Sequence, residues 1–315
     1  MAAVSADPEA TIAAKRRGRR LWPWLAALAA LAIGVVVALA VLQPWRLPPI
    51  PIRTADIETI LADRPDQMTI FRLDSNPRIL VLDFPDLHRQ ARMLDRIAVF
   101  LEKAGNAHDR VLSDAELDAA IAQLGDTYDT LYYGHDYRAA DIVRFFATAD
   151  RQGLALNEDE ERLRALLRQE GWTDAAAVGA IISLPRTNSA PDITASARDI
   201  ILRHELSHGE YFTSDPYAAF VRKFWRTALD DDEREKFRKF LGKDGYDTGL
   251  EDLMMNEAQA YLMFTRKSLF FDPALLGINP DRLRDLRAEF YAGMPRDWLR
   301  DQMPDPPPLG PAASN

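Results

Sequence analysis

An uncharged run of eighteen residues, Leu25 to Leu42 (LAALAALAIGVVVALAVL), constrains the fold of this chain more than any other segment. Five basic side chains lie just before it, between Lys15 and Arg20, and tryptophans stand on both sides of it. A basic flank, an apolar span of this length and aromatic residues at both ends are typical of a membrane-spanning helix. We therefore expect one transmembrane anchor, in residues 21–45.

The same charges predict the orientation of the anchor, because basic residues close to a span stay on the cytoplasmic side. Residues 1–20 then form a cytoplasmic N-terminus, and the body of the chain lies in the periplasm or another extracytoplasmic space. The alternative is a cleaved signal peptide, since Ala38-Leu39-Ala40 has the small-x-small form of a cleavage site. Both interpretations export the rest of the chain.

Composition excludes several kinds of site. The chain has no cysteine, so disulfides, cysteine zinc sites and thiol nucleophiles are ruled out, and a metal ion must be held by histidine and carboxylate. The formal net charge is −9, and the body is more acidic still because basic residues gather before the span. Such a body is a poor binder of nucleic acid.

Proline-rich segments bound the body of the chain. Residues 46–66 begin within PWRLPPIP and are expected to form an extended linker, and residues 304–315 (PDPPPLGPAASN) to form a disordered tail. Between them, residues 67–303 are expected to form one helix-rich domain of the mainly α (α+β) class with a small sheet. Two β-branched, apolar runs, Met68–Leu73 and Ile79–Phe84, flank a turn-forming DSNP and predict a hairpin.

Helical periodicity and capping signals predict most other elements. The expected helices cover residues 87–104, 114–124, 136–150, 158–170, 192–212, 216–229, 232–241, 249–266 and 280–292. Ala177–Leu184 is expected to be a further strand, with a buried helical turn as the alternative. As a sheet edge, this strand would pair with an extended peptide substrate.

The stretch RHELSHGEYF, residues 203–212, carries the clearest chemical signal. On a helix, His204 and His208 share one face, so their imidazoles can bind one metal ion. Zinc held by two histidines and a third protein ligand keeps an open position for a water whose pKa falls toward neutrality. Glu205 lies beside this face and can accept the proton of that water as a general base. The alternative is a surface helix with two unrelated histidines.

The pattern from Ile201 to Gly209 resembles that of the zincin metallopeptidases. The resemblance implies that this helix carries two zinc ligands, His204 and His208, and a catalytic glutamate, Glu205. Glu210 departs from the pattern, because a hydrophobic residue is usual there. The metzincin branch is excluded, since Tyr211 and Ser214 stand where it requires glycine and histidine.

The stretch Asn256-Glu257-Ala258-Gln259-Ala260 is similar to the N-E-x-x-[SA] pattern of the gluzincins. That resemblance implies a third zinc ligand, Glu257. The gap from His208 is longer than in the thermolysin-like type, and Tyr261 stands where many members have an aspartate.

The expected helix 249–266 supports the same residue. Glu257 lies in the middle of its apolar stripe, where a carboxylate faces a large desolvation cost unless it is paired or bound to metal. The stripe consists of Leu250, Leu253, Met254, Glu257, Tyr261 and Phe264. A salt bridge from Glu257 to Arg203 or Arg266 is the alternative. Other ligands considered are Asp252, Glu251, His135 and Glu210.

Tyrosines near the motif are candidates for stabilising the tetrahedral intermediate as proton donors. We expect Tyr211 in this catalytic role, with a packing role as the alternative. The other candidates are Tyr217, Tyr261 and the tyrosines of residues 132–137 (YYGHDY).

The sequence therefore predicts a membrane-anchored zinc metallopeptidase that hydrolyses peptide bonds in a peptide or protein substrate. Two alternatives stay open at this point. One is a catalytically inactive binding or scaffold protein of the cell envelope. The other is a zinc hydrolase that acts on a non-peptide amide or ester.

Overall fold

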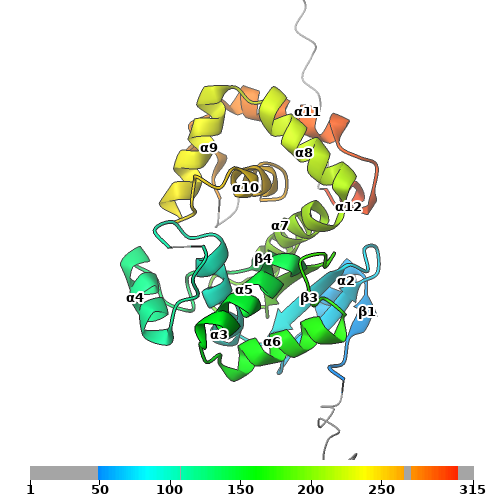
Figure 1. The fold of residues 1–315 in the computed structure, drawn as a ribbon. Coiled ribbons are helices and arrows are strands. Elements are labelled where there is room, and N and C mark those ends of the chain that lie inside the picture. Colours follow the sequence, from blue (N-terminus) through cyan, green and yellow to red (C-terminus); the bar gives the residue numbers. More distant parts are fainter. Residues whose placement is uncertain (1–48, 107, 266–270, 304–315) are drawn as a thin grey trace, which may run out of the picture. The chain divides into compact units, whose positions relative to one another are not determined.

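The computed structural model describes residues 49–106, 108–265 and 271–303 (Figure 1). The described chain is helix-rich with one small mixed sheet, which confirms the mainly α (α+β) class. The predicted anchor in residues 21–45 and the predicted tail 304–315 lie outside the described residues. Within the described residues, no helix has the length and apolar character needed to cross a membrane.

The sheet has five strands in the order β1-β2-β3-β5-β4. The predicted hairpin is confirmed, because β2 (Thr69–Leu73) and β3 (Ile79–Phe84) pair antiparallel. Strand β5 (Ala180–Pro185) runs parallel to β3 and antiparallel to β4 (His135–Arg138). The predicted strand at 177–184 therefore exists, but it is internal.

Two expectations about this sheet are wrong. Strand β5 has partners on both sides, so it is not an edge that can pair with a substrate; β4 is the edge strand on this side. The helix expected from residue 136 begins only at Ala139, since residues 135–138 pair with β5. A four-residue strand is too short to show its period in the sequence.

The segment expected to be a linker, 46–66, also belongs partly to the domain. Strand β1 (Arg53–Ala55) pairs parallel with β2, and helix α2 (Ile57–Ala62) follows it. The side chain of Asp56 caps α2 by accepting a hydrogen bond from the Thr59 amide. The extended, proline-rich character thus ends before residue 53.

All nine helices expected from the sequence have counterparts in the structure. They are α3 (Leu87–Leu101), α4 (Asp114–Leu124), α5 (Ala139–Gln152), α6 (Glu158–Gln169), α7 (Ala195–Thr213), α8 (Asp215–Thr227), α9 (Asp231–Lys243), α10 (Glu251–Met263) and α11 (Pro280–Gly293). Besides β1, α2 and β4, two further short elements were not expected, the 3-10 helix η1 (Pro273–Leu276) and helix α12 (Trp298–Asp301).

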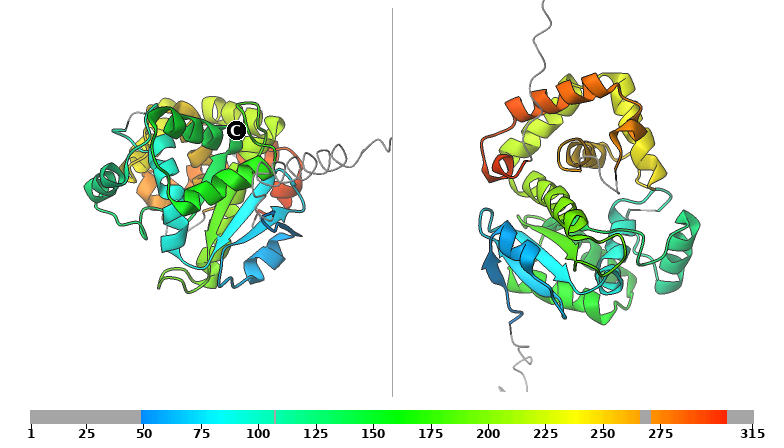
Figure 2. Two further views of the ribbon diagram at one scale, coloured as in Figure 1. Left: turned by 60° about the horizontal axis from the view of Figure 1, so that its bottom comes forward. Right: turned by 180° about the vertical axis from the view of Figure 1, so that it is seen from behind.

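The side chains of β3 alternate between two cores, as the two-residue period of a strand requires. Leu80 and Leu82 pack with α3, α5 and α6 on one face, whereas Ile79 and Val81 pack with α2 and α7 on the other. Helices α8 to α11 share a third core with the C-terminal part of α7. Helix α7 thus lies between the sheet and these helices, as Figure 2 shows.

Glycine allows α7 to approach the sheet closely. A Cβ atom at Gly209 would lie 2.9 Å from Cδ1 of Ile79 on β3. The motif residues of α7, His204, Glu205 and His208, belong to a helix that contacts both the sheet and α10.

Candidate metal centre

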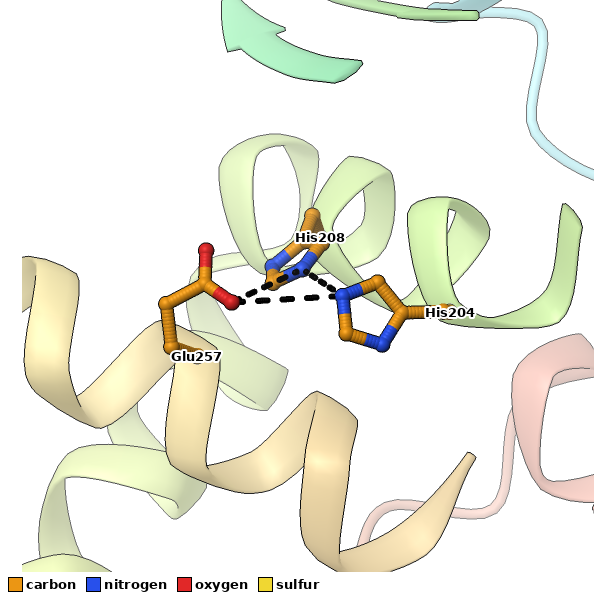
Figure 3. Close-up of side chains that lie close together, drawn as sticks. All are labelled: His204, His208 and Glu257. Atoms are coloured by element: carbon orange, nitrogen blue, oxygen red, sulfur yellow. Dashed lines mark hydrogen bonds and ion pairs between the residues drawn. The ribbon is translucent and has the colours of Figure 1, made fainter. Parts of the chain in front are cut away.

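The two motif histidines and the predicted third ligand converge on one point (Figure 3). The Nε2 atoms of His204 and His208, one turn apart on α7, lie 3.0 Å from each other. Oε2 of Glu257, which α10 contributes, lies 3.9 Å from Nε2 of His204 and 3.8 Å from Nε2 of His208. Two nitrogen atoms and one carboxylate oxygen therefore face a common centre.

This donor set fits a zinc ion. Zinc–ligand bonds of about 2.0–2.1 Å in tetrahedral geometry separate two donor atoms by about 3.3 Å, and the observed separations lie on both sides of that value. Glu257 is 1% exposed, and its Oε2 atom has no hydrogen-bond partner in the described structure. A buried carboxylate oxygen without a partner is costly, and a bound cation would remove that cost.

The structure does not pair Glu257 with Arg203, one of the two salt bridges considered as the alternative. Arg203 instead donates to Asp199 and to Gln302. Arg266 lies outside the described residues. The only basic side chains within 4.0 Å of Glu257 in the described chain are the two histidines, which are not charged near pH 7.

A hydrogen bond fixes the ring of His204 in the tautomer that a metal requires. Nδ1 of His204 lies 2.5 Å from Oγ1 of Thr265. That hydroxyl donates its own proton to the carbonyl of Ala260, so it accepts from Nδ1–H of His204. The lone pair of the histidine is therefore on Nε2, which faces Glu257.

Edge strand β4 brings a further carboxylate, Asp136, to the centre. Its Oδ1 atom lies 3.7 Å from Nδ1 of His208, a nitrogen that has no hydrogen-bond partner among the described side chains. At this distance the two side chains are in contact without a hydrogen bond, and burial raises the pKa of Asp136 well above the ordinary value. Asp136, Glu205 and His208 also form a second group close enough to hold a metal ion.

Glu205 lies beside the centre against the backbone of Gly134. The side chain is 5% exposed, and a Cβ atom at Gly134 would lie 2.2 Å from its Oε1 atom. Its Oε2 atom has no hydrogen-bond partner in the described residues. A carboxylate oxygen of Glu205 thus lies within 4.8 Å of a ring nitrogen of His208, and its Oε2 atom is free to accept a proton.

Burial determines the electrostatics of the centre. It raises the pKa of Glu205 and of Glu257 well above the ordinary carboxyl value, and it lowers the pKa of His208 to about 4. Burial and the neighbouring His208 also lower the pKa of His204. Both histidines are therefore neutral near pH 7, as ligands must be, and the carboxylates need a cation to stay ionised.

A cavity of about 460 Å³ opens beside the centre. His204 and Glu205 line it together with Asp136 from β4. The ring of Tyr261, the residue that stands where many gluzincins have an aspartate, lies 4.9 Å from the ring of His204 and also lines the cavity. A bound molecule can thus approach Glu205 and His204 from this side.

The structure argues against Tyr211 as the proton donor. Its hydroxyl donates to Oδ1 of Asp252 at 2.6 Å, and the residue lines a different hollow, not the cavity beside His204. Tyr211 is seven residues beyond His204, which moves it about 10 Å along the helix axis. The tyrosines that do line the cavity are Tyr132, Tyr133, Tyr246 and Tyr261.

The other residues considered as ligands are occupied elsewhere. Glu251 accepts from Trp225 and Arg238, and Glu210 accepts from Asn76 and Trp298. His135 bonds to Ser183 through Nδ1 and to Asp95 through Nε2.

Sequence reasoning missed the roles of Gly134 and Asp136. Both lie in the stretch YYGHDY, but Asp136 was assigned to the start of a helix. The only signal in the sequence was the concentration of polar and aromatic residues there.

No protein-family model, curated protein or solved structure matches this chain.

Proposed function

We propose that this chain is a membrane-anchored zinc metallopeptidase of the gluzincin-like zincin type. The observation that carries the proposal is the convergence of Nε2 of His204, Nε2 of His208 and an unpartnered, buried oxygen of Glu257. The adjacent glutamate and the cavity add a general base and a place for a substrate. In a scaffold protein that binds no metal, burying the two histidines and the Glu257 carboxylate without partners would only cost free energy of folding.

The residues of the chain divide the chemistry among them. A zinc ion, when bound, would polarise the scissile carbonyl and lower the pKa of a water molecule. Glu205 accepts the proton of the attacking water and returns it to the departing amine. Thr265 holds His204 in the required tautomer, and Asp136 faces the second nitrogen of His208. Tyr261, at the cavity wall beside His204, replaces Tyr211 as our candidate to stabilise the intermediate.

Substitution of the general base tests the mechanism. Glu205→Gln in the full-length protein should keep one zinc ion per chain but lower kcat by about 10²–10⁴-fold, because an amide cannot accept the proton. Zinc content is measured by mass spectrometry and turnover with a quenched peptide library. Wild-type turnover in Glu205→Gln would refute the mechanism. Turnover of esters or non-peptide amides with no peptide cleavage would instead assign the zinc hydrolase alternative.

Substitution of Glu257 separates ligation from a structural role. Glu257→Gln should weaken zinc binding by about 10²-fold or more, beyond the 10–100-fold loss typical when a residue that only orients a ligand is removed. His204→Ala and His208→Ala should lose zinc as well. Glu251→Gln, one turn and a half earlier on α10, is the matched control and should keep full zinc affinity. Intact zinc stoichiometry and affinity in Glu257→Gln would contradict the assignment.

The location of the domain forms part of the proposal. Since basic residues precede the span and Arg46 follows it, a C-terminal alkaline phosphatase fusion should be active and a C-terminal green fluorescent protein fusion dark in a bacterial host that exports proteins unfolded. Electrophoresis of the fusion tells an intact anchor from cleavage near Ala40. A fluorescent, phosphatase-inactive result would show that the body stays in the cytoplasm.

A further inference from the structure

The cavity beside the candidate metal centre has an unusual charge. Among the described residues of its wall, acidic side chains outnumber basic ones, since Lys103 and Lys243 are the only lysines or arginines there. The acidic residues of the wall are Glu102, Asp126, Asp136, Asp192, Glu205 and Asp244. The metal centre itself uses Glu257, which is not among them.

Most of these acidic groups lack a cationic partner. In the described part of the chain, none of the carboxylates of Glu102, Asp126, Asp192 and Asp244 lies within 4.0 Å of an arginine or lysine nitrogen. Carboxylates elsewhere on the surface are commonly paired, as Asp159 is with Arg92 and Glu116 with Arg110. Burial raises the pKa of Glu102 to about 7 and the pKa values of Asp136 and Glu205 well above the ordinary carboxyl value, so the negative charge of the wall rests mainly on Asp126, Asp192 and Asp244. These three aspartates still outnumber the two lysines around a space of about 460 Å³, which lies in the range of ligand sites.

A second observation points to a cationic ligand. Tyr132, Tyr246 and Tyr261 line the same cavity, and aromatic faces attract ammonium and guanidinium groups. Lys103 of this chain makes such a cation–π contact, because its Nζ atom lies 4.3 Å from the centre of the Tyr132 ring and 5.0 Å from that of the Tyr246 ring.

One buried carboxylate oxygen without a hydrogen-bond partner in the described residues also faces this space. Glu205 is 5% exposed, lines the cavity and has an Oε2 atom with no hydrogen-bond partner in the described residues. Lys103 donates to the carbonyl of Asp244, so its ammonium is directed to the backbone rather than to the acidic side chains. Lys103 interacts with Glu102, Asp126 and Asp244 at a distance, without a close ion pair, so it offsets only part of the negative charge of the wall.

We infer that this cavity selects peptide substrates carrying an ammonium or guanidinium group next to the cleaved bond. The inference rests on the proposed function, because the cavity shares His204 and Glu205 with the metal centre. The cationic group comes either from a lysine or arginine side chain or from the free amino terminus of the peptide. Acidic peptides are disfavoured by the same unbalanced charge.

Binding to the full-length Glu205→Gln protein, loaded with zinc, tests the inference without turnover. The probes are acetylated octapeptide amides that differ at one central position, which is lysine, arginine, glutamine or glutamate, and a glutamine peptide with a free amino terminus. By calorimetry, the cationic peptides should bind about tenfold more tightly than the acetylated glutamine peptide. This difference in affinity should become smaller as the salt concentration rises from about 0.05 to about 0.5 M, since screening weakens exposed charge pairs.

The arms of the experiment separate the two sources of the cation. Tight binding of the lysine and arginine peptides assigns side-chain recognition, whereas a gain confined to the free amino terminus assigns recognition of the chain end. Equal dissociation constants for the lysine, glutamine and glutamate peptides would overturn the inference. Uptake of a second zinc ion that abolishes the lysine preference would assign the acidic wall to a metal instead.

Substitutions at the cavity wall locate the effect. Asp192→Asn and Asp244→Asn, both exposed and away from the presumed ligands, should each weaken binding of the lysine peptide about two- to fivefold, as loss of an exposed charge pair does. Asp74→Asn, an exposed aspartate in the β2–β3 turn that does not line the cavity, is the matched control and should change nothing. Unchanged lysine-peptide binding in the Asp192/Asp244 double variant would also overturn the inference.

Zinc content keeps the two proposals apart. If the protein binds zinc and cleaves peptides without regard to charge, only the substrate inference fails. If it binds lysine peptides but no zinc, the peptidase proposal fails and the cavity remains a site for cationic peptides.

Discussion

At the residue scale, the backbone of Gly134 sets the position of the general base. The carboxylate of Glu205 lies against this glycine so closely that a Cβ atom would come within 2.2 Å of Oε1, 2.7 Å of Cδ and 2.9 Å of Cγ. Only the removal of a side chain leaves room for Glu205 next to the histidines. The stretch YYGHDY shows neither that Glu205 packs against Gly134 nor that residue 134 must lack a side chain.

Gly134→Ala should therefore move Glu205 and lower kcat by about 10²-fold, because a displacement of about 1 Å in a reacting group has an effect of that size. Zinc content and thermal stability should stay close to wild type, since the flexible end of one side chain absorbs the clash. Gly242→Ala, at an exposed glycine of α9 whose added Cβ would meet one methyl group, Cγ2 of Thr248, at 3.1 Å, controls for the general effect of replacing a glycine by alanine. Full activity in Gly134→Ala would show that this contact does not position the base.

At the element scale, helix capping orders the segment that leads into the cavity. Helix α4 opens with a capping box in which Glu116 accepts from the backbone and side chain of Ser113. It ends at Gly125 with a φ of 82°, a left-handed conformation that favours glycine. The cavity residues Asp126 and Tyr132 follow directly.

The cap makes α4 sensitive to acid. Hydrogen bonds from Ser113, and then from Arg110, lower the pKa of Glu116 to about 2 from a usual 4.5. Because the folded-state pKa is depressed, this carboxylate stabilises the fold above pH 4.5, and the contribution is lost as the pH falls toward 2. Glu116→Gln should therefore lower the melting temperature at pH 7 and have a smaller effect near pH 3. Glu289→Gln, exposed on α11, is the control, and an effect of Glu116→Gln that grows as the pH falls would contradict the assignment.

A buried glutamate explains a departure from the zincin pattern on α7. Glu210, which stands where a hydrophobic residue is usual, accepts at Oε2 from Asn76 in the β2–β3 turn and from Trp298 on α12. These hydrogen bonds connect α7 with two elements that are remote in sequence. The polar residue is thus accommodated by tertiary partners, which a local motif cannot show.

At the scale of the whole molecule, the candidate metal centre joins two cores. His204 and His208 belong to α7, which packs on the sheet, and Glu257 belongs to α10, which packs with α8 and α9. A metal ion bound by both helices would therefore stabilise the packing of one core on the other.

Removing the metal should lower the stability of the folded protein. At free zinc about a hundredfold above the dissociation constant, binding contributes about 2.7 kcal/mol. For a domain of this size, that corresponds to a rise in melting temperature of about 5–10 °C. Calorimetry of the full-length protein before and after chelation, with zinc added back, measures the difference. Glu257→Gln serves as the control in which chelation should have a much smaller effect, and an unchanged melting temperature for the wild type would argue against a bound metal.

The sequence by itself determined the features that depend on neighbours along the chain. The spacing of His204, Glu205 and His208 places these side chains together on any α-helix, because the helical repeat is fixed. Capping residues and apolar periodicity likewise predicted the helices, and β-branched runs around a turn predicted the β2–β3 hairpin. These signals are local, so they can be recognised in the sequence without knowledge of the fold.

Only the tertiary structure decided which distant residues complete the site. The apolar stripe of α10 suggested that Glu257 needs a partner, but the packing of α10 against α7 brings its carboxylate to the two histidines. Pairing with β5 makes residues 135–138 an edge strand, which places Gly134 against Glu205 and Asp136 beside His208. The same packing directs Tyr211 away from the cavity. These positions depend on contacts between segments tens of residues apart, and no local pattern encodes the distances that such contacts set.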